Sequence, residues 1–224
     1  MRQPLAKRVV AEALGTFFLL AAVVGSGIMA ERLANGNSAL ALLANTAATG
    51  AALIALIISF APLSGAHFNP VVTLSFALRH DLLWREVAVY LLAQVTGGIG
   101  GVIAANLMFG LPAVFISQQP RTGMAQLFSE FIATVGLVSV ILAASRSTVA
   151  VVAVAVGAYI SAAYWFTSST SFANPAVTVA RSLSDTFAGI RPVDAPGFVL
   201  AQLAGGIAAT VLFRWLIPSE SEEP

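Results

Sequence analysis

The sequence predicts an all-α membrane protein with six transmembrane helices and two shorter, re-entrant half-helices. Three observations indicate this fold class. The chain of 224 residues is 58% hydrophobic and only 9% charged, whereas soluble globular proteins carry about 25% charged residues. Six stretches reach about 20 predominantly apolar residues, the length that crosses a bilayer as a helix. Two further apolar segments contain Asn-Pro and are too short to span.

Each of the six predicted spans contains at most one charged residue. Glu12 lies in the first, Glu130 in the fourth, and Arg214 near the end of the sixth. The first stretch is too long for the apolar region of a signal peptide and lacks a clear cleavage site, so we expect it to be retained as a span. The predicted ranges are 9–30, 39–63, 87–109, 125–144, 149–166 and 198–217.

The distribution of lysine and arginine predicts that both termini are cytoplasmic, because cytoplasmic segments of membrane proteins carry an excess of these residues. With the N-terminus inside, the cytoplasmic segments hold seven such residues and the opposite segments hold four. The seven are Arg2, Lys7, Arg8, Arg79, Arg85, Arg146 and Arg214, and the four are Arg32, Arg121, Arg181 and Arg191.

The two Asn-Pro segments, residues 64–74 and 171–180, fall in loops on opposite sides of the predicted bundle. Asparagine caps helices through its side chain, and proline is favoured at the first helical position. Each Asn-Pro pair therefore predicts the start of a short helix. A run of about ten apolar residues cannot cross a bilayer, so we expect each half-helix to be re-entrant and surrounded by protein or a water-filled cavity.

The two halves of the sequence repeat the same features in the same order, 105 to 118 residues apart. Because each copy holds three spans, an odd number, the second copy must enter the membrane from the opposite side. This predicts inverted repeats over about 1–115 and 120–224, with a permeation site between the broken helices. The repeated features are Glu12 and Thr16 with Glu130 and Thr134, Asn69-Pro70 with Asn174-Pro175, Ala93-Gln94 with Ala201-Gln202, and Gly97-Gly98 with Gly205-Gly206.

Together these motifs resemble the major intrinsic protein family, the aquaporins and aquaglyceroporins. The resemblance covers essentially the whole chain, including the Ala-Glu-Ala-Leu-Gly-Thr-Phe run at 11–17, the Ser-Gly-Ala-His-Phe-Asn-Pro run at 64–70 and the second Asn-Pro pair. It implies one channel domain over 1–224, an aquaporin-like bundle around one pore per subunit, and a homotetramer in the bacterial inner membrane. It also implies passive transport of small uncharged polar solutes.

The resemblance assigns the two Asn-Pro boxes to the pore. We expect Asn69 and Asn174 to cap the half-helices and also to present amide N–H groups to the lumen. Glu12 and Glu130 are expected to accept hydrogen bonds from the re-entrant loops, with a proton relay as the alternative role for an intramembrane acid. His67 is expected to line the cytoplasmic half of the pore. The boxes consist of Asn69, Pro70 and Val71, and of Asn174, Pro175 and Ala176.

Spacing from each Asn carries the family's outer constriction to Thr49, Ala162, Ser171 and Val177. Thr49 precedes Gly50 as in the family, whereas the aromatic residues after Ala163 leave the position of Ala162 open to a shift of one or two residues. These side chains are small, so the sequence predicts a wide pore. The alternatives are a water-selective aquaporin and a glycerol facilitator.

The sequence departs from the family pattern at two positions. Val71 stands where the family usually has Ala, and we expect it to repack the contact between the half-helices. Val177 stands where most members carry the arginine of the constriction. Arg181 lies one helical turn further on, so it can reach the outer vestibule but occupies a different geometric site. Glycerol facilitators usually keep that arginine and follow it with Asp, whereas Thr178 follows here. The pattern is more similar to the subgroup found with bacterial arsenic-resistance genes, which implies passage of arsenous acid.

Composition also bears on other function classes. The chain has no cysteine and two histidines, which predicts no metal site and no cofactor. Eleven Lys and Arg against ten Asp and Glu give no basic surface for nucleic acid. A secondary transporter would need further buried ionisable residues to couple an ion, and a membrane enzyme would need a catalytic constellation. The sequence favours a channel whose partners are the lipid bilayer and small neutral solutes.

Overall fold

The computed structural model describes residues 3–217, so Arg2 lies outside the described residues. Within that range the chain forms eight α-helices, and six of them are long and apolar enough to cross a membrane. The predicted all-α class is confirmed. The helices are α1 (Leu5–Leu33), α2 (Ser38–Ser64), α3 (Pro70–Leu78), α4 (Trp84–Met108), α5 (Met124–Ala144), α6 (Val149–Phe166), α7 (Pro175–Arg181) and α8 (Ala195–Leu216).

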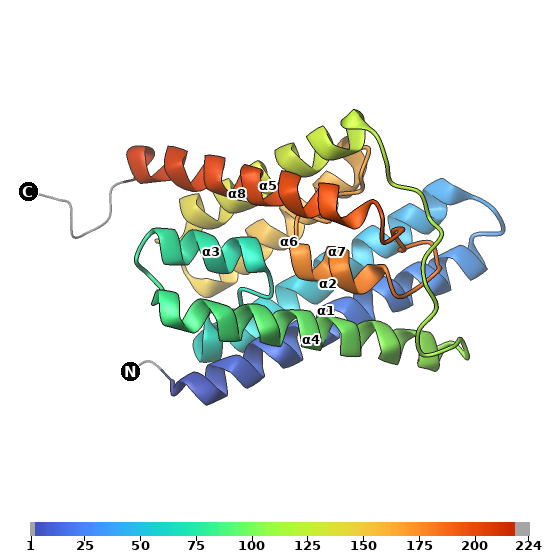
Figure 1. Cartoon of the computed structure of the whole chain (residues 1–224), viewed down its shortest axis with the longest axis horizontal. Coiled ribbons are helices and arrows are strands. Elements are labelled where there is room, and N and C mark those ends of the chain that lie inside the picture. The colour runs from blue at the N-terminus through green and yellow to red at the C-terminus, as the bar shows by residue number, and fades with distance from the viewer. Residues whose placement is uncertain (1–2, 218–224) are drawn as a thin grey trace, which may run out of the picture.

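The six long helices lie side by side, and the two short helices lie among them (Figure 1). Helix α1 begins and α8 ends at the same end of the bundle, which we call the near end, and the opposite end is the far end. Helix α3 occupies the near half and α7 the far half. The two half-helices therefore approach the middle of the bundle from opposite ends, as the sequence predicts.

All six predicted spans agree with the observed helices to within four residues at each end. The largest difference is at α1, which begins at Leu5 rather than residue 9. Hydropathy marks only the apolar part of a helix, and α1 continues into a polar first turn that includes Lys7 and Arg8. The half-helices start at Pro70 and Pro175, with Asn69 and Asn174 as their N-caps.

Glycines bring the long helices into close contact. A methyl group added to Gly97 of α4 would lie 2.2 Å from the carbonyl oxygen of Ala13 in α1. A methyl group added to Gly205 of α8 would lie 2.6 Å from the carbonyl oxygen of Phe131 in α5. Small residues allow backbones to approach in this way inside a membrane. The glycine pairs are therefore helix contacts.

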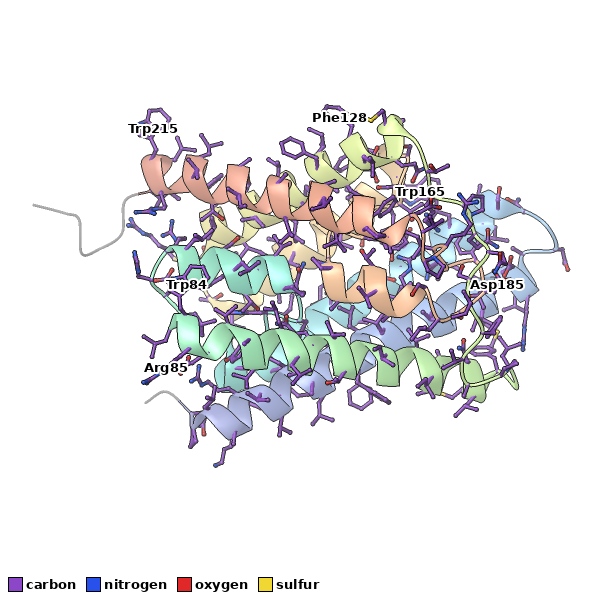
Figure 2. The ribbon with its side chains drawn as sticks, in the orientation of Figure 1. Trp84, Arg85, Phe128, Trp165, Asp185 and Trp215 are labelled. Carbon is purple, nitrogen blue, oxygen red and sulfur yellow. The ribbon has the colours of Figure 1, made fainter. Side chains whose placement is uncertain are left out.

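Tryptophan side chains mark the two ends of the bundle (Figure 2). Trp84 and Trp215 lie at the near end and Trp165 lies at the far end. All three are exposed. Tryptophan is enriched where a membrane meets water, so these residues place the bilayer between the two ends.

Candidate functional site

A cavity of about 310 Å³ lies inside the bundle. It is lined by residues of α1, α2, α5 and α6 and by both re-entrant segments. On α6 the lining extends from Val149 to Tyr164, a separation of fifteen residues or about 22 Å along a helix. The cavity thus extends from Ser145, Ser147 and Val149 at the near end of the bundle to Tyr164 and Arg181 toward the far end. We call these two ends of the cavity its near and far mouths.

Both box asparagines cap a half-helix and line the cavity. The Asn69 side-chain oxygen accepts a hydrogen bond from the Val71 N–H at 2.9 Å. The Asn174 oxygen accepts from the N–H groups of Ala176 at 3.0 Å and Val177 at 3.3 Å. Both side chains are part of the cavity wall. Helix capping and cavity lining therefore occur together in these two residues.

The same two amides join the re-entrant loops to each other. Asn69 Nδ2 donates to the carbonyl oxygen of Ala173, and Asn174 Nδ2 donates to that of Phe68, each at 2.8 Å. This pair of bonds is reciprocal between the halves of the chain. Each amide has a second N–H that these two bonds do not use.

The loop backbones before the half-helices have matching unusual conformations. Ala66 and Phe68 have φ of 51° and 49°, and Ser171 and Ala173, each 105 positions later, have φ of 49° and 47°. Left-handed backbone at residues other than glycine persists only where the surrounding structure enforces it. The buried acids supply part of that constraint.

Glu12 and Glu130 accept hydrogen bonds from these loops and from α4 or α8. Glu12 accepts from the backbone N–H groups of His67 at 2.9 Å and Phe68 at 2.7 Å. Glu130 accepts from those of Phe172 at 2.9 Å and Ala173 at 2.8 Å. Side-chain donors complete each set: Ser64 and Gln94 for Glu12, and Gln202 for Glu130. In all seven contacts a carboxyl oxygen of Glu12 or Glu130 is the acceptor.

The structure shows Val71 packed against two of the long helices. A methyl group on Gly206 of α8 would lie 2.1 Å from Val71 Cγ1, and Val71 packs with Val138, Leu142 and Ala209 of α5 and α8. At least part of this side chain therefore faces the long helices, and the expected repacking between the half-helices stays a prediction.

Three of the four predicted constriction residues line the far half of the cavity: Thr49, Ser171 and Val177. The Ser171 hydroxyl is buried and has no hydrogen-bond partner among the described residues, so it can bond a solute. Tyr164 also lines the cavity, and its hydroxyl donates to Thr49 Oγ1 at 3.3 Å.

Ala162 lies on the exposed surface and is absent from the cavity wall. Successive residues of an α-helix are rotated by about 100°. Ala162 lies two positions from both Ile160 and Tyr164, which line the cavity, so it faces away from them. Tyr164 is the α6 residue beside Thr49, a shift of two positions from the predicted site. The cavity-lining residues of α6 are Val149, Val152, Val156, Ile160 and Tyr164.

His67 lines the near half of the cavity and stacks on Phe76, with ring centroids 4.7 Å apart. Its Nδ1 lies 3.1 Å from Thr73 Oγ1. The Thr73 hydroxyl donates its hydrogen to the Asn69 carbonyl and accepts from Gln94. A hydroxyl has one hydrogen, so we assign Nδ1 of His67 as the donor to Thr73.

Two arginines contribute to the far end, and the sequence indicates only one of them, Arg181. Arg181 lines the cavity and is only 2% exposed. Its spacing of four from Val177 was the available signal, since such residues share a helix face. Arg121, between α4 and α5, donates to the carbonyl oxygens of Gly189 at 2.7 Å and Ser169 at 3.0 Å. Burial lowers the pKa of Arg121. No sequence signal indicated these loop contacts.

Comparison with known proteins gives a consistent set of similarities. The family model described as Major intrinsic protein matches residues 1–151. Aquaglyceroporin AqpS of Rhizobium meliloti (strain 1021) is 57% identical over 213 residues, which cover 95% of this chain and 91% of that protein. Aquaporin NIP1-4 of Oryza sativa subsp. japonica is 33% identical over 207 residues, covering 88% and 72%. The X-ray structure of the aquaglyceroporin from Plasmodium falciparum superposes with a TM-score of 0.75 at 20% identity, covering 98% of each chain.

Proposed function

Since this chain belongs to the major intrinsic protein family and is a channel for water and small solutes, we propose that its pore is wide enough for uncharged solutes of glycerol size. The observation that carries the proposal is the far half of the cavity, where Val177 takes the place of the usual arginine. The neighbouring side chains there, Thr49, Tyr164 and Ser171, offer hydroxyl groups.

The mechanism follows from the polarity of the cavity wall. Each half-helix has the positive end of its dipole near the middle of the pore, equivalent to roughly half a unit charge. Cations are repelled there and also lose hydration that the narrow wall does not replace. Neutral solutes avoid this cost, because they can replace hydrogen bonds to water with hydrogen bonds from the second amide N–H of Asn69 and Asn174. Much of the remaining wall is apolar, so it suits uncharged solutes.

Arsenous acid is a candidate among these solutes. It is a neutral trihydroxylated molecule near pH 7, comparable to glycerol in size and hydrogen bonding. The supporting observation is that the constriction has Val177 in place of an arginine, which the subgroup found with bacterial arsenic-resistance genes also lacks. Passage of arsenous acid is thus proposed from both pore width and resemblance, and pore width alone supports only the class of glycerol-sized solutes.

Stopped-flow light scattering on reconstituted vesicles tests the proposal with water, glycerol, urea and arsenous acid. We expect glycerol and arsenous acid to cross wild-type vesicles faster than empty vesicles. Val177→Arg should reduce both fluxes relative to water, because it adds a long cation beside Thr49 and Ser171. Equal glycerol and arsenous acid rates in wild-type and empty vesicles, or an unchanged ratio to water in Val177→Arg, would contradict the wide pore.

Flux that rises linearly with solute concentration and needs no ion gradient would separate a passive channel from a secondary transporter. The buried acids Glu12 and Glu130 bond the loops, and no acid lines the cavity among the described residues. Family members are channels, and we propose that this chain has no enzymatic activity. Turnover of any permeant solute by purified protein would contradict this.

We propose that both termini are cytoplasmic, in a bacterial inner membrane. Arg8 is buried in an ion pair with Glu86 at 2.6 Å and Arg181 is buried in the cavity wall, so neither is a surface cation. Leaving these two arginines out changes the count of Lys and Arg from seven cytoplasmic against four on the opposite side to six against three. The chain has no cysteine, so a single introduced Cys is a specific label. In intact cells, a membrane-impermeant maleimide should label Thr122→Cys, at the far end of the bundle, and leave Ser147→Cys, at the near end, unlabelled.

We further propose that the channel is a homotetramer of single-domain subunits, each made of inverted repeats over about 1–115 and 120–224. The matched contacts of Glu12 and Glu130 and of Asn69 and Asn174 support the repeats. Native mass spectrometry of detergent-purified protein would test the tetramer.

A further inference from the structure

One side chain gives the cavity wall a permanent charge. Among the described residues that line the cavity, Arg181 is the one Asp, Glu, Lys or Arg. It lies at the last position of α7, four residues after Val177, or about 6 Å further along the helix axis. The positive charge of the pore is therefore near the far mouth, beyond the residues that set its width.

The Arg181 guanidinium is held in place. Its Nε–H donates to the carbonyl oxygen of Ala188. The guanidinium carbon lies 3.4 Å from the centre of the Phe172 ring, a cation–π contact. Phe172 is fixed in turn by its N–H bond to Glu130. The charge is thus part of the rigid wall, in contrast to a mobile surface side chain.

This guanidinium forms no ion pair with a described residue, and the buried acid that acts on it electrostatically, Glu130, is engaged by the loop N–H groups. Arg181 takes part in none of the ion pairs that join Arg8 to Glu86, Arg79 to Asp81 and Arg191 to Asp194. The guanidinium of Arg121 also lies near Phe172, 4.8 Å from the ring centre, and adds charge of the same sign. An unpaired buried charge is costly, which favours a functional reason for its presence.

We propose that Arg181 is the specificity-determining residue that excludes cations at the far mouth, and that this charge selection is separate from size selection at Thr49, Tyr164, Ser171 and Val177. The proposal rests on the channel function above. Two electrostatic barriers then act in series: the guanidinium at the far mouth and the two half-helix ends at the middle. A neutral solute passes both, and the remaining guanidinium N–H groups can donate to its hydroxyl oxygens.

The test separates ion conductance from solute flux. Arg181→Gln should raise potassium conductance in planar bilayers by at least about tenfold, the order expected when a fixed unit charge is removed from a low-dielectric pore wall. Its glycerol-to-water flux ratio in vesicles should stay within about twofold of wild type, because the width-setting residues are unchanged. Val177→Arg should behave in the opposite way, with a reduced ratio and no potassium leak.

Two further variants complete the design. Arg181→Lys keeps the charge and should exclude potassium. Arg32→Gln removes a cation from the exposed far surface outside the cavity and should leave both measurements unchanged. If Arg181→Gln does not fold, Arg181→Met supplies the uncharged wall with a side chain of similar length.

The proposal is overturned if the folded, uncharged variant conducts no more potassium than wild type, if Arg181→Lys leaks as much as the uncharged variant, or if Arg32→Gln leaks equally. These readings are made on preparations whose wild-type vesicles pass glycerol faster than empty ones. Absence of that wild-type flux would instead contradict the proposed function.

Discussion

Replacing Glu130 by Gln tests whether the buried acids hold the re-entrant loops or relay protons. Glu130 Oε1 accepts from the Phe172 N–H at 2.9 Å, and Oε2 accepts from the Ala173 N–H at 2.8 Å and from Gln202 Nε2 at 2.6 Å. A Gln side chain can keep its oxygen at the Oε2 position and save two of these bonds. Its NH₂ then faces the Phe172 N–H, which is left without an acceptor.

A buried donor without a partner costs about 1–3 kcal/mol, so this is the expected loss for Glu130→Gln. Glu130→Ala leaves both loop N–H groups and Gln202 without the acid, and the two N–H groups alone cost about 2–6 kcal/mol. For a chain of this length, each kcal/mol lowers the melting temperature by about 2–4 °C. We expect the order of stability to be wild type, Gln variant, Ala variant.

Thermal melting of detergent-purified protein, followed by fluorescence-detected size exclusion, measures this order. Glu31→Gln is the matched control because Glu31 is exposed on α1, and it should melt with wild type. Water and glycerol flux per folded channel should stay within about twofold of wild type in Glu130→Gln. A normal melting temperature together with abolished or pH-shifted flux would refute the loop-holding role and indicate a relay.

The remaining predictions concern contacts within the half-helices. Asn69→Asp and Asn174→Asp replace the donor to the Ala173 or Phe68 carbonyl with an acceptor, so two oxygens meet where a 2.8 Å hydrogen bond was. We expect a reduced yield of folded protein or a cation leak. Full yield with unaltered solute flux and no leak would contradict the pore-lining role. Gly206→Ala should destabilise the fold by about 1–3 kcal/mol through overpacking, because its methyl group would lie 2.1 Å from Val71 Cγ1. Adding Val71→Ala should restore most of the melting temperature, and a double variant no more stable than Gly206→Ala would place the clash elsewhere.

Local signals in the sequence were sufficient to predict where the helices lie. Hydropathy located the spans, and Asn-Pro located the starts of both half-helices, because capping depends on neighbouring residues. Ala162 was misplaced since the rotation of α6 about its own axis is set by packing on α2 and α5. The contacts of Arg121 with Ser169 and Gly189 join distant loops and have no local signature. The α6 residue at the far mouth and the contacts of Arg121 therefore required the tertiary structure, whereas Thr49, Ser171 and Val177 followed from spacing.

The reciprocal bonds of Asn69 and Asn174 have a consequence for biosynthesis. A chain emerging from the ribosome presents the first re-entrant loop about a hundred residues before the second. Until then Asn69 has no Ala173 carbonyl to bond, and the Phe68 carbonyl has no Asn174 donor. Unbonded polar groups are costly in a lipid interior, so the first loop is expected to remain hydrated at the membrane surface. Its final docking is therefore a late, post-translational step that both halves complete together.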